Sequence, residues 1–155
     1  MRPTRIQTYM ECAQAWAKRS TCHRLNVGAV IVVDRTIVSH GYNGVPSGHE
    51  HCLGNACPGK FECKETIHAE VNAILRCPWL PERGRNVDMY CTDSPCPDCA
   101  KRIHERGIHR VFFATPYRIT TSLDWLMLSG VEVYRVTPAG YVIDWKTRDV
   151  VEPVV

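Results

Sequence analysis

The spacing of apolar residues changes along the chain, and each change marks a predicted element. Residues 4–19 carry apolar side chains three and four positions apart, which predicts a helix with one buried stripe. Residues 28–33 form an unbroken apolar run rich in β-branched side chains, which is typical of a buried strand. A short turn at 34–36 leads into a second strand at 37–41, so the two strands are predicted to pair as an antiparallel hairpin.

Helical and strand patterns alternate in the second half of the chain. The predicted strands lie at 89–91, 111–114 and 131–134, and the predicted helices at about 67–77, 97–106 and 121–129. The helix between the last two strands implies a crossover, so those strands should be parallel. We therefore predict a single α/β domain over residues 1–155, with a mixed five-stranded sheet and helices on both faces. The tail from residue 137 fits either an added strand or a loose end.

Composition narrows the function classes. A chain of 155 residues with 45% hydrophobic residues suits one globular domain, and a formal charge of +3 is too mild to indicate nucleic-acid binding. No apolar run approaches the ~20 residues of a membrane span, and the start lacks the apolar core of a signal peptide. Nine cysteines is an odd count that argues against complete disulfide pairing. We therefore expect a cytoplasmic protein, with no membrane partner, whose thiols bind metal.

Two short motifs, a His-x-Glu and a later Pro-Cys-x-x-Cys, carry the residues for a metal site. Zinc is bound tetrahedrally by nitrogen and sulfur, and a catalytic zinc keeps one position open for water. His68, Cys96 and Cys99 supply three ligands, which leaves Glu70 beside the metal as a proton carrier. A helix that starts at Pro97 places both thiols on one face, and its positive N-terminal end favours their thiolate forms.

Each motif alone has an ordinary explanation. An isolated Cys-x-x-Cys can be a redox pair, and a lone His-x-Glu is common by chance. In this order, each followed by a helical run, the two match the signature of zinc deaminases. His68 and Glu70 are two positions apart and would diverge in the middle of a helix, so both can reach the metal only from its first turn. Asp98 is expected only to stabilise the helix whose first turn it occupies.

A cysteine-bearing insertion at about residues 45–65 interrupts the regular pattern. Its glycines and prolines break any periodicity, and a loop this long inside a compact domain is uncommon unless it is functional or pinned. A second, closed zinc site would hold it in place, with the ligands Cys22, Cys52, Cys57 and Cys63. His49 or His51 could replace one of these ligands. The alternative is that the four cysteines are small buried thiols.

The chain resembles the deoxycytidylate (dCMP) deaminases of the cytidine deaminase superfamily over most of residues 1–136. The resemblance rests on four motifs, which are Val27-Gly28-Ala29-Val30, Gly41-Tyr42-Asn43-Gly44, Thr66-Ile67-His68-Ala69-Glu70 and Ser94-Pro95-Cys96-Pro97-Asp98-Cys99. The zinc motif alone indicates only the superfamily. The Gly-Tyr-Asn-Gly motif, combined with the cysteine-bearing insertion, points to the branch that acts on nucleotides.

The resemblance implies a three-layer α/β/α cytidine deaminase-like fold and the hydrolysis of dCMP to dUMP and ammonia. It implies His68, Cys96 and Cys99 as ligands of the catalytic zinc, with Glu70 as the proton shuttle. It also implies a second zinc in the insertion and a homo-oligomer, often a hexamer.

Substrate contacts follow from the same resemblance. Asn43 is expected near the substrate sugar and Tyr117 near the nucleotide, and Ala29 is assigned to the same substrate-binding set. A monophosphate needs cations, and Arg24 is assigned to it. The other available cations are Lys60, Lys64, Arg85 and Arg118.

The Gly41-Tyr42-Asn43-Gly44 motif is predicted to be a turn whose glycines let backbone amides approach a ligand closely. The resemblance implies control by deoxynucleoside triphosphates. We expect dCTP to activate and dTTP to inhibit, with Mg²⁺ assisting triphosphate binding at this turn. The alternative is an ordinary tight turn that positions Asn43 and does nothing else.

Two other function classes compete with a nucleotide deaminase. A deaminase of bases within nucleic acid would need a broad basic surface and room for a flipped nucleotide. The mild net charge and the insertion argue against it. A zinc-stabilised nucleotide-binding module that has lost catalysis is the other alternative, and the presence of Glu70 argues against that.

Overall fold

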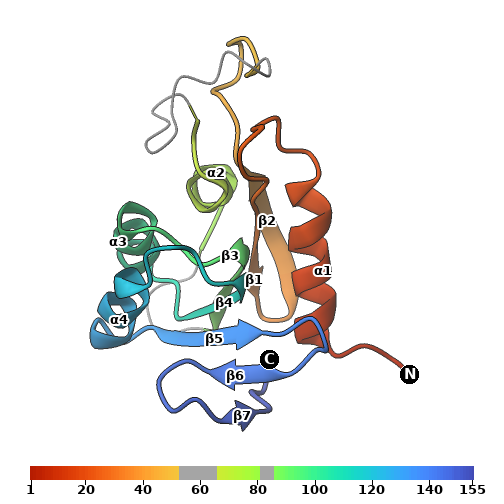
Figure 1. Cartoon of the computed structure of the whole chain (residues 1–155), viewed down its shortest axis with the longest axis vertical. Coiled ribbons are helices and arrows are strands. Elements are labelled where there is room, and N and C mark those ends of the chain that lie inside the picture. The colour runs from red at the N-terminus through yellow and green to blue at the C-terminus, as the bar shows by residue number, and fades with distance from the viewer. Residues whose placement is uncertain (53–65, 81–85) are drawn as a thin grey trace.

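The computed structural model describes residues 1–52, 66–80 and 86–155, drawn in Figure 1. The elements of the described chain, in order, are α1 (Arg5–Ala17), β1 (Gly28–Val33), β2 (Thr36–Tyr42), α2 (Ala69–Arg76), β3 (Val87–Asp93), α3 (Pro97–Glu105), β4 (Arg110–Thr115), α4 (Thr121–Leu128), β5 (Glu132–Val136), β6 (Val142–Asp144) and β7 (Val150–Val151).

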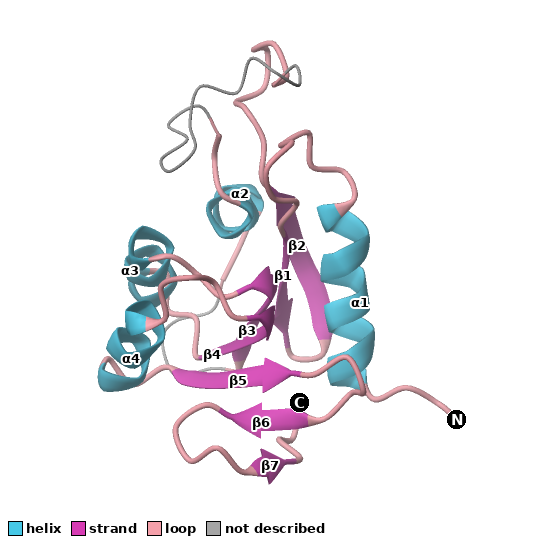
Figure 2. Ribbon diagram, viewed as in Figure 1, coloured by secondary structure: helices cyan, strands magenta, loops and turns pink. Residues whose placement is uncertain are grey.

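The described strands form one mixed sheet in the order β2-β1-β3-β4-β5-β6-β7 (Figure 2). The predicted hairpin is confirmed, because β1 and β2 pair antiparallel. The predicted crossover is also confirmed, because β4 and β5 are parallel, as are β3 and β4. The sheet has seven strands rather than the five predicted, since the tail adds β6 and β7. These two strands are three and two residues long, which is too short for a recognisable alternation.

Helices cover both faces of the sheet, which confirms the predicted three layers (Figure 1). Alternate residues of β1 face opposite helices, as the two-residue period of a strand requires. Val30 and Val32 pack in one hydrophobic cluster with Met10 of α1. Ala29 and Ile31 belong to a second cluster, with residues of α2, α3 and α4. Because both faces are covered, all six residues of β1 are buried and its sequence is continuously apolar.

Helix α2 lies in direct contact with strand β2, and glycine at position 41 is what allows it. A Cβ at Gly41 would overlap the carbonyl oxygen of Ala69 and lie 2.5 Å from the Ala73 nitrogen. A side-chain hydrogen bond strengthens the contact, since Asn72 Nδ2 donates to the Tyr42 carbonyl at 2.9 Å. The helix that carries His68 and Glu70 at its start is therefore fixed to the sheet through backbone atoms.

A buried ion pair holds the C-terminal tail against the sheet. Arg110, at the start of β4, donates two hydrogen bonds to the carboxylate of Asp88 on β3, at 2.6 and 2.8 Å. The same guanidinium donates to the Val154 carbonyl at 2.7 Å. Arg110 therefore links β3, β4 and the end of the tail, in addition to the strand pairing that places β6 and β7 at the sheet edge.

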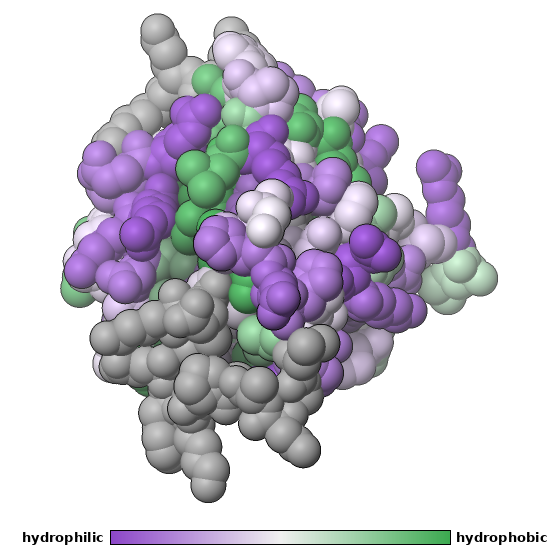
Figure 3. All heavy atoms as spheres, turned by 90° about the horizontal axis from the view of Figure 1, so that it is seen from above, coloured by the Kyte–Doolittle hydropathy of each residue, from purple (hydrophilic) through white to green (hydrophobic). Residues whose placement is uncertain are grey.

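The described surface seen from above is mostly hydrophilic, with hydrophobic side chains in a narrow band between polar ones (Figure 3). Among the helices that the structure describes, none combines the length and the apolar character needed to cross a membrane.

Gly41→Ala is expected to lower the free energy of unfolding by about 1–3 kcal/mol, because the added methyl group meets helix backbone that cannot rotate away. Gly44→Ala is the matched control, since a Cβ there would lie 3.7 Å from Thr21 Oγ1 in ordinary contact. It should change the free energy of unfolding by less than about 1 kcal/mol. Urea denaturation of both variants measures the difference, and equal stabilities would contradict the role given to Gly41.

Candidate active site

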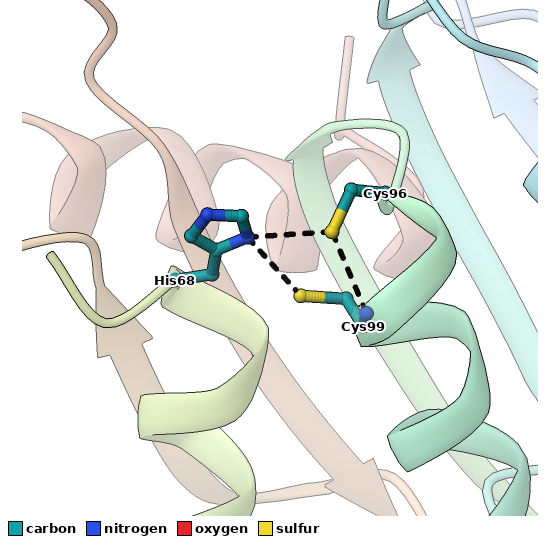
Figure 4. Close-up of side chains that lie close together, drawn as sticks. All are labelled: His68, Cys96 and Cys99. Atoms are coloured by element: carbon teal, nitrogen blue, oxygen red, sulfur yellow. Dashed lines mark hydrogen bonds between the residues drawn. The ribbon is translucent and has the colours of Figure 1, made fainter. Parts of the chain in front are cut away.

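The three predicted metal ligands lie together (Figure 4). His68 is the residue before α2, Cys96 is the residue before α3, and Cys99 lies in the first turn of α3. The Nδ1 atom of His68 is 3.4 Å from the sulfur of Cys96 and 3.3 Å from that of Cys99. The three candidate ligand atoms all lie within 4.8 Å of one another. The structure therefore brings together residues that are 28 and 31 positions apart in sequence.

Local sequence explains why both helices start at this point. Cys96 has extended backbone and its sulfur accepts a hydrogen bond from the Cys99 amide, which caps the helix. Pro97 follows at the first helical position, where its missing N–H costs nothing. His68 also has extended backbone before α2, with φ −68° and ψ 153°. Each ligand-bearing residue therefore projects from a positive helix end.

The donor set has the dimensions of a zinc site. Tetrahedral zinc with its usual bond lengths separates a nitrogen and a sulfur ligand by about 3.5 Å. The observed separations of 3.4 and 3.3 Å agree with this value. One nitrogen and two sulfur ligands also match the catalytic zinc pattern, in which the fourth position is left for water or substrate. The residues present fit zinc.

The two thiols have opposite pKa shifts. A hydrogen bond from Cys99 lowers the pKa of Cys96 to about 4. The same hydrogen bond raises the pKa of Cys99. Cys99 donates this bond through its S–H group, and it would lose the bond if it ionised beside the Cys96 thiolate. The hydrogen bond with Cys96 also raises the pKa of His68. Without metal the pair therefore keeps one proton, which zinc binding would release, because thiolates are the ligating form.

Glu70 lies in the first turn of α2, as the sequence argument required, and its side chain is almost fully buried at 4% exposure. Burial raises the pKa of this carboxyl group to about 7. A carboxyl group that titrates near neutral pH is suited to accept a proton and to return it.

The site opens into a cavity of about 520 Å³. His68, Glu70 and Cys96 form part of its wall, and so do Arg24, Asn43 and Tyr117, which were predicted to contact the substrate. Ala29 was placed in the same set, but it is fully buried in the core between β1 and the helices and is not part of the lining.

Several residues of the cavity wall were not predicted as site residues, among them Asp93, Ser94 and Ile119. Asp93 and Ser94 line it at the end of β3, and Ile119 lines it from the segment between β4 and α4. Asp93 and Ser94 could have been suspected, because sites gather beyond the carboxyl ends of parallel strands. No sequence signal distinguishes Ile119.

The side-chain amide group of Asn43 is hydrogen-bonded to backbone groups. Its side-chain oxygen accepts from the Val27 amide at 2.9 Å, and its side-chain nitrogen donates to the Leu25 carbonyl at 2.7 Å. These two bonds hold the segment that enters β1 beside the cavity. Asn43 therefore shapes the cavity wall, and its side-chain oxygen and nitrogen each keep one further hydrogen-bonding position.

The Gly41-Tyr42-Asn43-Gly44 motif is not the turn that was predicted. Gly41 and Tyr42 are the last residues of β2, and Gly44 forms a bridge with Ile67. The Asn43 amide donates to the Val27 carbonyl and the Gly44 amide to the Ile67 carbonyl, each at 3.2 Å. The glycine at 41 serves helix packing, and the amides of Asn43 and Gly44 are already paired within the chain.

The predicted second zinc site falls partly outside the described residues. Cys57 and Cys63 lie there, as do the candidate cations Lys60, Lys64 and Arg85. Cys22 and Cys52 are described, and their segments lie side by side, because His23 Nε2 is 2.8 Å from the Cys52 carbonyl oxygen and Thr21 Oγ1 is 3.5 Å from His51 Nδ1.

Comparison with known proteins decides the family. Residues 3–115 match the family described as the cytidine and deoxycytidylate deaminase zinc-binding region. This chain is a member of that deaminase family. The matched range contains His68, Glu70 and both cysteines of the cluster.

Three proteins similar to this deaminase show how far the similarity extends. It is 37% identical over 145 residues to the ComE operon protein 2 of Bacillus subtilis, covering 92% of this chain and 77% of that protein. It is 35% identical over 149 residues to the deoxycytidylate deaminase of Schizosaccharomyces pombe, covering 88% of this chain but 45% of that protein. A crystal structure of the dCMP deaminase from cyanophage S-TIM5, in complex with dCMP and dUMP, superposes with a TM-score of 0.75 at 37% identity, covering 87% and 98% of the two chains.

Proposed function

We propose that this deaminase hydrolyses dCMP to dUMP and ammonia. The observation that carries the proposal is the His-Cys-Cys cluster with a buried carboxyl group beside it, at the wall of a cavity large enough for a nucleotide. The likeness to a dCMP deaminase that binds dCMP and dUMP supports this substrate.

His68, Cys96 and Cys99 would hold the zinc ion. Bound zinc lowers the pKa of a bound water from 15.7 to about 7 and so supplies a nucleophile at neutral pH. Glu70 is proposed to carry two protons in turn at a carboxylate oxygen. The first is taken from the attacking water and passes to the ring nitrogen. The second is taken from the new hydroxyl group on the ring carbon and passes to the amine, which leaves as ammonia while the carbonyl group forms. A pKa of about 7 for Glu70 supports this role, because both protonation states are then populated at neutral pH.

The charges around the cavity suit a small anionic substrate. Arg24 and Arg118 supply cations for the phosphate, and Tyr117 a side wall for the nucleotide. Asp93 and Asp98 line the same cavity. Their negative charges break up the positive surface that a nucleic-acid strand would need, which favours a mononucleotide over a base in a polymer.

Further properties rest on family membership. We propose a second zinc bound through Cys22, Cys52, Cys57 and Cys63, and a homo-oligomer, often a hexamer in this family. The proximity of the segments around Cys22 and Cys52 supports the second zinc. We also propose activation by dCTP and inhibition by dTTP, with Mg²⁺ assisting. Since the amides of Asn43 and Gly44 are paired, an effector at this motif would contact the half-buried Tyr42 side chain instead.

Ammonia release from dCMP, deoxycytidine, dCTP and a cytosine-containing oligonucleotide, measured side by side, tests the substrate. We expect dCMP to have the highest kcat/KM. Glu70→Gln is the matched control, because glutamine keeps the shape of the side chain but cannot carry the proton. The kcat of this variant should fall roughly 10²–10⁴-fold while its zinc content is unchanged. Preferred turnover of the oligonucleotide, or near-normal turnover by zinc-loaded Glu70→Gln, would contradict the proposal.

Metal analysis of protein purified without chelators should give two zinc ions per chain. Cys96→Ala should lose one ion and all activity while leaving most of the fold. Cys52→Ala should lose the other ion and lower the melting temperature, because a structural zinc contributes folding free energy directly. Cys12→Ala is the control, since this half-buried thiol packs against the core beneath α1. A wild-type value of one zinc would rule out the second site.

If dCTP and dTTP regulate this enzyme as proposed, each should shift the dCMP saturation curve. A coupling free energy of about 1–3 kcal/mol corresponds to an affinity change of about 5–150-fold, toward tighter dCMP binding with dCTP and weaker binding with dTTP. The initial rates should be measured across dCMP concentrations with each triphosphate and Mg²⁺. Curves that stay superimposable at saturating dCTP and dTTP would show that the chain is not regulated in this way.

A further inference from the structure

The two residues before Cys96 are held by hydrogen bonds from the next strand and helix along the chain. The Ser94 amide donates to the Thr115 carbonyl at 2.9 Å, and the Ser94 hydroxyl accepts from the Tyr117 amide at 2.7 Å. The Pro95 carbonyl accepts from the Ser122 hydroxyl at 2.6 Å. Ser94 and Ser122 are buried, with exposures of 3% and 2%. These bonds join the cysteine-bearing segment to the end of β4, to the segment that follows it and to the first turn of α4.

The bonds to Ser94 and Ser122 act on different parts of the site. Ser122 contacts Pro95, which directly precedes the Cys96 ligand. Ser94 instead contacts Tyr117, and the segment 117–119 supplies one wall of the cavity through Tyr117, Arg118 and Ile119. The 117–119 segment lies between strand β4 and helix α4, and the bond from the Tyr117 amide to the Ser94 hydroxyl holds it close to the cysteine segment. The Ser94 hydroxyl is the side-chain anchor that joins it directly to the cysteine segment.

We propose that Ser94 is a positioning residue that sets the distance between the nucleotide-binding wall at 117–119 and the Cys96 ligand. The inference rests on the proposed function for the identity of the nucleotide. Without the hydroxyl, the half-buried Tyr117 amide loses its acceptor beside the buried Ser94, and the segment is expected to shift so that water can take the place of that acceptor. The wall then moves away from the substrate, while the zinc ligands and Glu70 keep their own supports.

Ser94→Ala separates this role from a general effect on stability. Its KM for dCMP should rise about tenfold, while kcat changes less than about threefold and the zinc content stays at the wild-type value. Ser39→Ala is the matched control. It also removes one buried serine hydroxyl, which donates to the Ala73 carbonyl at 2.6 Å, but it lies between β2 and α2. It should lower the melting temperature by a similar amount without a comparable rise in KM.

Limited trypsin digestion gives a second readout that needs no activity. Cleavage after the exposed Arg118 should be several-fold faster in Ser94→Ala than in the wild type and in Ser39→Ala, under conditions where all three remain folded. Unchanged cleavage together with unchanged KM would overturn the inference. So would a loss of zinc, or a fall in kcat as large as the rise in KM, since either would mean that Ser94 supports the metal ligands instead.

The two proposals fail in different ways. If wild-type protein does not deaminate dCMP, the proposed function is wrong, and the digestion experiment still decides whether Ser94 holds the 117–119 segment. If the wild type is active and Ser94→Ala behaves like Ser39→Ala in both experiments, the proposed function stands and the positioning role is wrong.

Discussion

The backbone contact between helix α2 and strand β2 fixes the position of the groups proposed to react. Gly41 presents no side chain to the Ala69 carbonyl and the Ala73 amide, so the helix rests on the strand itself. Gly28 does the same for helix α1 on the other face, where a Cβ would overlap the Ala13 carbonyl. Contacts between backbone atoms leave less freedom than contacts through flexible side chains. The first turn of α2, with Glu70, is therefore held in place relative to the sheet.

The second ligand-bearing helix reaches the same point from a different strand. Strand β3 lies between β1 and β4, and the segment after it places Cys96 at the start of α3. His68 and Cys96 both precede a helix and both have extended backbone. Two positive helix ends therefore converge on one small volume, where they favour thiolates and other anions. The sheet aligns helices α2 and α3, and the N-terminal ends of the two helices supply the positive potential at the site.

The metal cluster could be predicted from the sequence because its chemistry restricts residue type and spacing together. Cys96 and Cys99 needed only a helix start at Pro97, and that start is confirmed. The Gly-Tyr-Asn-Gly motif could not be interpreted in this way. Gly41 fits a turn and a closely packed strand equally well. The contact that requires glycine is with the Ala69 backbone, which belongs to a helix later in the chain. The short strands β6 and β7 likewise depend on pairing, of β6 with β5 and of β7 with β6, rather than on their own pattern.

Burial and hydrogen bonding divide the anionic groups of the cluster into two chemical roles. Cys96 is half-buried and receives hydrogen bonds from Cys99, so its pKa falls to about 4 and it is a thiolate at neutral pH. Glu70 is more completely buried, and the loss of solvation raises its pKa to about 7. Groups whose surroundings move their pKa values apart in this way can act as a permanent anion and as a proton carrier within one site. A bound zinc would lower the pKa of the nearby carboxyl group, since a cation favours the charged form. Burial of Glu70 opposes that effect, and this opposition is what would leave the carboxyl group able to hold a proton beside a metal ion.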